Sequence, residues 1–138
     1  MRTIATCVAI LLVLLAWEGQ SSRVLGECIK LNESLEQMFM RSQLVFVADV
    51  LGVDNVVQPE SFRQRVRFRV IEAYRGIERG EQVVLFRPTA EDFVFSASQR
   101  VLVYAGGRRD NYSTQCTATR VVTLKDAELQ ELRRLARK

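Results

Sequence analysis

The chain has 138 residues, a formal net charge of +4 and no histidine. This length suits one domain with one core, and so small a positive excess does not by itself indicate a nucleic-acid-binding protein. The absence of histidine removes the commonest metal ligand and the commonest general base. Composition therefore counts against a metalloenzyme and against acid–base catalysis.

Residues 1–26 predict a secretory signal peptide. A basic residue near the N-terminus precedes the run 4–17, which has 14 residues and no charge. A membrane-spanning helix needs about 20 apolar residues, so this run is too short, and small polar residues follow it. Cleavage after Ser21 and cleavage after Gly26 both fit, and the alternatives are a buried helix or an uncleaved anchor. With the leader cleaved, we expect a domain over 27–138 and no stable membrane anchor.

The number of cysteines agrees with export, because an even pair remains once the leader is removed. Cys7 would leave with the leader, which leaves Cys28 and Cys116. The extracellular space and the periplasm are oxidising, so we expect these two to bond to each other. The loop would hold about 90 residues and contribute about 4–5 kcal/mol on the chain-entropy model. The alternative is two buried free thiols. We expect a secreted protein, or a periplasmic or cell-surface one if the source is bacterial.

A short helix is predicted over Ser34–Arg41. Ser34 followed by Gln37 fits a capping box, in which each side chain satisfies a free N–H at the helix start. Three apolar residues at helical spacing give the helix one buried face. These are Leu35, Met38 and Phe39.

Short strands occupy the middle of the chain. We predict strands over 43–53, 62–74, 81–87, 100–105 and 111–117, with a loop over 54–61, an irregular segment over 89–98 and a turn over 106–110. Strand 62–74 has the clearest pattern, because apolar or amide residues alternate with arginines along it. Period two places one set toward the core and the other toward solvent. The expected inner set is Phe62, Gln64, Val66, Phe68 and Val70.

A second helix ends the chain. Thr123 followed by Asp126 marks its start, and its last residues are basic, which suits the negative end of a helix dipole. Its apolar stripe consists of Leu124, Leu129, Leu132, Leu135 and Ala136. The order of elements predicts a mainly β fold, a five-stranded OB-like antiparallel barrel flanked by an N-terminal and a C-terminal helix.

Several segments in order then resemble a known family. They are Cys28, Ser34-Leu35-Glu36-Gln37-Met38-Phe39, Ser42-Gln43-Leu44-Val45-Phe46-Val47-Ala48-Asp49-Val50, Phe68-Arg69-Val70-Ile71-Glu72-Ala73-Tyr74-Arg75-Gly76, Arg100-Val101-Leu102-Val103-Tyr104-Ala105 and Cys116-Thr117-Ala118-Thr119. Together they resemble the netrin-like module of the tissue inhibitors of metalloproteinases, in a short single-domain version. The resemblance covers about 26–132. It implies a secreted OB-like barrel whose N-terminal segment is tied to the barrel by disulfides.

The family's disulfide framework is half present. Family members start with Cys-x-Cys, and the second of their two pairs maps onto Cys28 and Cys116. The first pair is missing at both ends, at Gly26 and in the loop Glu91–Val94. Inhibition in the family uses an N-terminal cysteine to chelate the protease zinc, and this chain has none at that position. The resemblance thus implies a non-catalytic module that binds an extracellular protein or a polyanion, with metalloproteinase inhibition as the alternative.

One row of side chains is a candidate binding site. The outward residues of strand 62–74 would lie about 6–7 Å apart and could bind a polyanion such as a glycosaminoglycan, because guanidinium groups pair well with sulfate and phosphate. They are Arg63, Arg65, Arg67 and Arg69. The alternative is a solvated strand face whose arginines pair with acids on neighbouring strands. Nucleic acid is not expected, because Phe62 and Phe68 share the phase of the core and leave no stacking platform.

The remaining motifs are few. Asn32 and Asn111 each begin a glycosylation sequon, which matters if the source is eukaryotic. Glu91 and Asp92 are adjacent in a loop, where two carboxylates rarely converge on one substrate atom. We expect no catalytic residue, no cofactor and no metal site.

Overall fold

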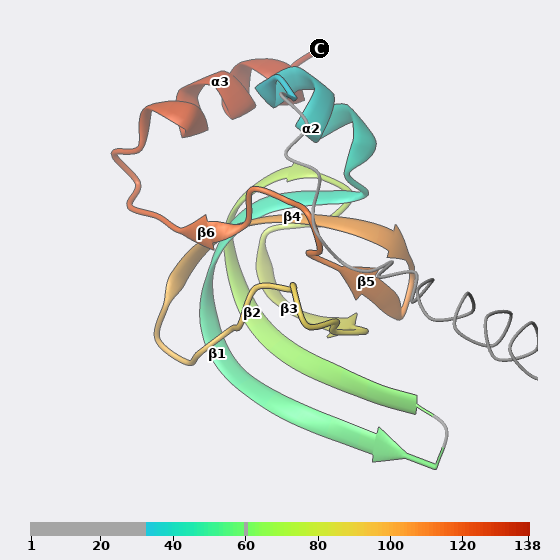
Figure 1. Ribbon diagram of the computed structural model, residues 1–138. Helices are drawn as coiled ribbons and strands as arrows, with labels where there is room; N and C mark the ends of the chain where they lie inside the picture. The colour runs from blue at the N-terminus through green and yellow to red at the C-terminus, as the bar shows by residue number, and fades with distance from the viewer. Residues whose placement is uncertain (1–32, 60) are drawn as a thin grey trace, which may run out of the picture.

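The computed structural model describes residues 33–59 and 61–138 (Figure 1). Two helices and six strands follow one another along this part of the chain. They are α2 (Leu35–Arg41), β1 (Leu44–Gln58), β2 (Ser61–Arg75), β3 (Gly80–Phe86), β4 (Arg100–Arg108), β5 (Asn111–Ser113), β6 (Arg120–Val121) and α3 (Ala127–Ala136). Neither helix has the length or hydropathy needed to span a bilayer.

Five strands close a barrel. The strand order is β1-β2-β3-β5-β4, and β4 returns to pair with β1, while β6 adds to the outer edge of β4. All of these pairings are antiparallel except the short junction of β3 with β5, where Phe86 lies beside Tyr112. The predicted fold class is therefore confirmed: a mainly β, OB-like barrel with one helix before it and one after it.

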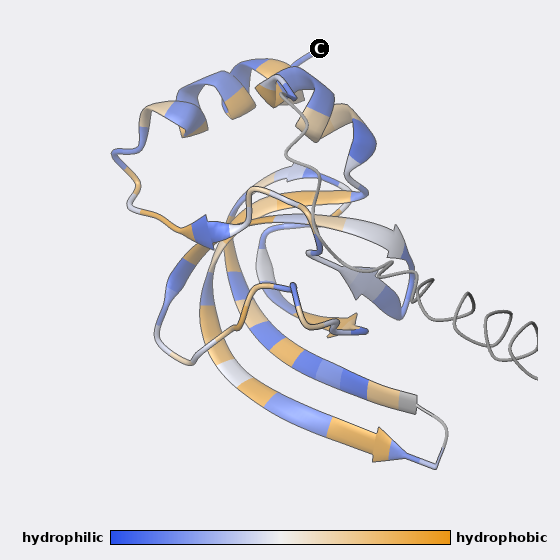
Figure 2. Cartoon of the chain, viewed as in Figure 1, coloured by the Kyte–Doolittle hydropathy of each residue, from blue (hydrophilic) through white to orange (hydrophobic). Residues whose placement is uncertain are grey.

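The barrel interior is filled by alternate residues of its strands. Phe68 lies near the centre, with its ring 5.1 Å from that of Phe46 and 5.4 Å from that of Phe95, edge to face. The buried members include Leu44, Phe46, Val50, Val66, Phe68, Val70, Val84, Phe86, Phe95, Val101 and Val103. Three of the five predicted inner positions of β2 are thus confirmed. Figure 2 shows the matching alternation of hydrophobic and hydrophilic residues along β2.

A second core lies between the barrel and the two helices. The outward residues of β1 and β4 meet the apolar faces of α2 and α3 there, and the cluster consists of Phe39, Val45, Val47, Tyr74, Leu102, Tyr104, Val122, Leu129, Leu132 and Leu135. The hydroxyl of Tyr104 donates to Glu128 at 2.8 Å, which ties the barrel to α3. The helices therefore cover one side of the barrel, including the end of β2 around Glu72 and Tyr74, and within the described residues they leave the outer face of β2 from Arg63 to Arg69 uncovered (Figure 1).

The capping box of the first helix is confirmed. The side chain of Ser34 accepts from the backbone N–H of Gln37, and the side chain of Gln37 accepts from the backbone N–H of Ser34. At the other end of the chain, Asp126 rather than Thr123 caps the final helix, accepting from the backbone N–H of Glu128. Leu124 precedes this helix and is 40% exposed, so its place in the apolar stripe was predicted wrongly.

The predicted loop over 54–61 is wrong. β1 continues to Gln58 and pairs with β2 as far as Ser61, which makes a hairpin arm that reaches beyond the barrel (Figure 1). Phe62 keeps the phase of the core residues but is 45% exposed, because it lies on this arm, past the end of the interior. The prediction that Phe62 faces the core is therefore also wrong.

The end of the barrel also differs from the prediction. β4 continues through the predicted turn to Arg108. β5 ends at Ser113, so Cys116 lies in a turn, with φ of 56°, and not in a strand. β6 was not predicted, because two residues carry no periodicity that a sequence pattern can show.

Candidate functional site

The arginine row, Arg63, Arg65, Arg67 and Arg69, lies on the outer face of β2. Its members alternate with the buried residues Val66, Phe68 and Val70. Three of the four arginines are exposed, and Arg63 is half-buried. The row thus occupies a part of the outer barrel face that the two helices do not cover.

Acidic neighbours neutralise only part of this row. Arg69 approaches Glu81 of β3, with Nη2 and Oε1 3.6 Å apart and side chains that are 59% and 74% exposed. An ion pair so exposed contributes little, about 0–1 kcal/mol. Asp54 of β1 is the register partner of Arg65, but the two side chains do not form an ion pair. Within the described residues the row has no other ion pair, so a solvated strand face and a polyanion site both stay open as interpretations.

Two further contacts fix the direction of individual guanidinium groups. Nη1 of Arg63 donates to Oδ1 of Asn111 at 3.4 Å, which draws this side chain toward β5. Arg67 lies over Gly52 of β1, where an added Cβ would stand 2.7 Å from Nη2. A register shift between Val50 and Gly52 accompanies this close approach. Arg63 thus points toward β5, and Arg67 points toward β1.

Asp92 closes the loop between β3 and β4 and has no catalytic geometry. Oδ2 accepts from the backbone N–H and the hydroxyl of Thr89, at 2.5 and 2.7 Å. Oδ1 accepts from the hydroxyl of Ser113 and the backbone N–H of Thr114, at 2.8 and 2.6 Å. Burial alone would raise the pKa of Asp92, but these hydrogen bonds outweigh it and hold the pKa below its usual value. The carboxylate thus serves the loop that places Phe95 in the core.

Replacing Asp92 with asparagine should make the protein less stable at neutral pH. It should also make the free energy of unfolding depend less on pH in the acid range. Charged hydrogen bonds are lost, so the free energy of unfolding should fall by about 2 kcal/mol at pH 7. Because the folded pKa is lowered, this stabilisation is present above the unfolded pKa of about 4 and is lost as pH falls through the folded value. Urea unfolding of both proteins across the acid range measures this. Parallel pH curves for the two proteins would contradict it.

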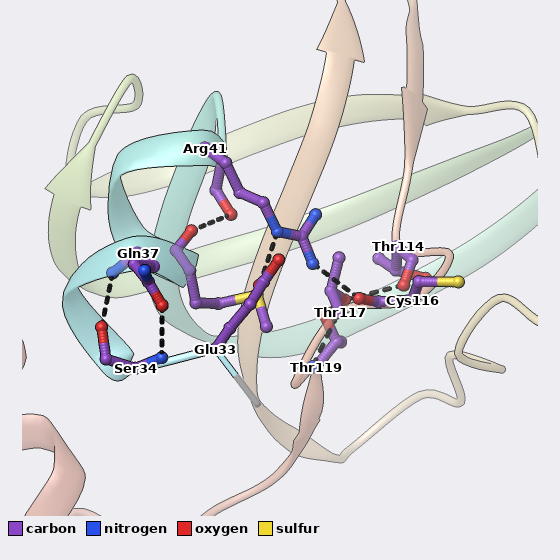
Figure 3. Close-up of polar contacts among 10 residues, drawn as sticks. Glu33, Ser34, Gln37, Arg41, Thr114, Cys116, Thr117 and Thr119 are labelled. Carbon is purple, nitrogen blue, oxygen red and sulfur yellow. Dashed lines mark hydrogen bonds and ion pairs between the residues drawn. The ribbon is translucent and has the colours of Figure 1, made fainter. Parts of the chain in front are cut away.

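A clamp at Arg41 holds the start of the described chain against the barrel (Figure 3). Nε of Arg41 donates to Glu33 at 2.7 Å, and Nη2 donates to the backbone carbonyl of Cys116 at 2.7 Å. Cys28 precedes Glu33 by five residues, and five extended residues span at most about 17 Å. The clamp therefore brings the chain within reach of Cys116.

The predicted disulfide falls partly outside the structure. Cys28 and the sequon residue Asn32 lie outside the described residues. Cys116 is not a free titrating thiol. The pairing of Cys28 with Cys116 stays a prediction, which the Arg41 clamp supports.

An open groove of about 580 Å³ lies between β1, the start of β4 and the segment before α3. Arg100 donates to both carboxylate oxygens of Asp49 at its wall, at 2.8 and 3.0 Å. This hydrogen bond, together with the charge of Arg100, holds the pKa of Asp49 below its usual value. The two groups satisfy each other, so this charged pair is not available to select a ligand.

The described residues contain no group of three or more potential metal ligands among histidine, cysteine, aspartate and glutamate. No protein-family model matches the chain. A search of curated proteins finds no match either. The netrin-like family thus stays an expectation from the sequence, and the functional argument rests on the site.

Proposed function

We propose that this chain is a secreted, non-catalytic binding module of the netrin-like type, and that the arginine row binds a linear polyanion. The observation that carries the proposal is the position of Arg63, Arg65, Arg67 and Arg69 on a part of the outer barrel face that the two helices do not cover. Three of these side chains are exposed, and the row makes one ion pair, an exposed one, within the described residues.

The fold favours such a use of this face. In OB-type barrels the second and third strands and the neighbouring loops bind oligosaccharides or oligonucleotides. Here the second of these strands, β2, carries arginines about 6–7 Å apart, a spacing that follows from the period of the strand. Stacking of nucleic-acid bases needs aromatic side chains beside the cations. Phe68 is buried and Phe62 lies on the opposite face of β2 from the arginines, so an anionic polysaccharide such as a glycosaminoglycan fits better.

Replacing Arg65 and Arg67 together with serine should weaken the binding of a heparin-derived octasaccharide at least tenfold. Both side chains are exposed and neither has an ion pair, so their loss leaves the core intact. Each lost contact should also reduce the slope of log Kd against log salt concentration by about one, as counterion release predicts for polyanions. Isothermal titration at several salt concentrations measures both effects.

Lys125→Ser/Arg137→Ser is the matched control, because both residues are exposed, one before α3 and one at its end, and the pair of substitutions removes the same two positive charges. It should leave the affinity within about twofold of the wild type, as expected when surface cations outside the site are removed. Equal binding by the wild type and the Arg65→Ser/Arg67→Ser variant would reject the polyanion proposal.

Metalloproteinase inhibition is the other function that the resemblance implies. The residues that would chelate the protease zinc belong to the N-terminal segment, which lies outside the described residues. No contact in the described part of the chain favours inhibition. The two functions separate experimentally, since inhibition would depend on the mature N-terminus, and polyanion binding would depend on β2.

A further inference from the structure

Three arginines from distant parts of the sequence surround Asn111 at one end of the arginine row. Arg63 belongs to β2, Arg87 directly follows β3, and Arg108 ends β4. We refer to Arg63, Arg87 and Arg108 around Asn111 as the arginine corner. We propose that the arginine corner is a discrete binding site for a sulfate or phosphate monoester group, and this inference rests on the proposed function of the row.

The strand registers place the corner on one face. Arg108 lies directly opposite Asn111 in the pairing of β4 with β5. Directly opposed residues of an antiparallel pair point to the same side of a sheet. Asn111 binds the guanidinium group of Arg63, an outer-face residue, so Arg108 also points outward.

Arg87 joins this face from β3. Phe86 is buried in the barrel, and the backbone N–H of Arg87 donates to the carbonyl of Tyr112 at 2.8 Å, so the extended pairing continues past Phe86. Side chains alternate along a strand, which turns Arg87 outward. Gln64 is the register partner of Phe86, so Arg87 lies one step further, beside Arg63.

The corner carries positive charge. None of its three arginines takes part in an ion pair within the described residues. The carboxylate of Asp92 is near, because it binds Ser113 of β5, but hydrogen bonds from Thr89, Ser113 and Thr114 occupy both of its oxygens. In the strand order β2-β3-β5-β4, Arg63 and Arg87 are neighbours, and Arg108 lies two strands from Arg87 with Asn111 between them. Neighbouring strands are about 4.8 Å apart, so these long side chains can reach one anion placed over Asn111.

The chemistry of the donors selects the anion. Guanidinium groups on three different strands and the amide N–H₂ of Asn111 can approach one ligand group from several directions. A sulfate or phosphate monoester presents three terminal oxygens, each a strong acceptor. A carboxylate presents two oxygens in one plane, which a single arginine can satisfy. The corner should therefore prefer ester groups to carboxylates.

The test replaces the two corner arginines that lie outside the row. Arg87→Ser/Arg108→Ser should weaken the binding of a heparin octasaccharide at least tenfold and leave the thermal midpoint unchanged, because both side chains are exposed. Wild-type protein should bind heparin or polyphosphate at least tenfold more tightly than polygalacturonate of similar length, and this preference should shrink in the variant. The tighter of the two ester polymers identifies the source of the group. Lys125→Ser/Arg137→Ser, which removes the same two positive charges elsewhere on the surface, controls for net charge.

The outcomes separate the corner from the row. If Arg87→Ser/Arg108→Ser binds like the wild type while Arg65→Ser/Arg67→Ser does not, the corner is rejected and the row stands. If the corner variant loses affinity equally for the ester polymers and for polygalacturonate, the ester preference is wrong. If Arg65→Ser/Arg67→Ser binds like the wild type, the proposed function itself fails, and the corner, which rests on it, fails with it.

Discussion

Replacing Phe68 with alanine should lower the free energy of unfolding by about 3–5 kcal/mol. The ring is fully buried and lies edge to face with the rings of Phe46, Phe86 and Phe95, at centroid distances of 5.1, 6.3 and 5.4 Å. These partners come from β1, β3 and the loop before β4, so the cavity left by the ring would touch three separate parts of the barrel. Domains are stable by about 5–15 kcal/mol, so this loss is a large share, and urea unfolding at neutral pH measures it.

Val83→Ala on β3 is the control for that experiment. Val83 is 58% exposed on the outer face of the same sheet, so its truncation leaves no cavity. Its effect should stay within about 0.5 kcal/mol. A loss below about 1 kcal/mol for Phe68→Ala would mean that the four phenylalanine rings do not form the packed centre of the barrel.

The sequence predicted the barrel where a local pattern carried the information. Alternation along β2 identified Val66, Phe68 and Val70 as core residues, and the capping box identified the start of α2. The prediction failed where the conformation of a segment depends on residues far away in the sequence. Residues 54–58 are polar enough to look like a loop, yet they extend β1 because β2 offers a pairing edge. Phe62 follows the core phase but lies beyond the barrel end, and no local pattern marks where the interior stops.

The candidate site divides in the same way. The row on β2 follows from period two alone, since its four members share one strand. The corner could not be predicted, because Arg63, Arg87 and Arg108 come together only through the registers of β2 with β3 and of β4 with β5. The sequence does contain a partial signal for Arg87. If Phe86 is assigned to the core, alternation along the strand predicts that the next residue, Arg87, points toward solvent. The parallel junction of β3 with β5 carries no comparable signal in the sequence.

Breaking the predicted bond between Cys28 and Cys116 should lower the free energy of unfolding by about 4–5 kcal/mol. The bond would close a loop of about 90 residues and remove that much chain entropy from the unfolded state. Cys116→Ser should produce this loss in urea unfolding, because its turn is otherwise held by hydrogen bonds that the substitution leaves in place, including that from Arg41 to its carbonyl. Wild-type protein in reductant should match the variant.

Comparing the cysteine variants tests whether Cys28 is the disulfide partner of Cys116. If Cys28 and Cys116 bond to each other, Cys28→Ser, Cys116→Ser and the double variant should all lose the same free energy, since each removes one and the same bond. The oxidised wild type should also have a mass two hydrogens below that of the reduced chain. Additive losses, or a loss confined to Cys116→Ser, would reject the pairing. In that case the Arg41 clamp, with its hydrogen bonds to Glu33 and to the carbonyl of Cys116, would have to hold the N-terminal segment without a covalent bond.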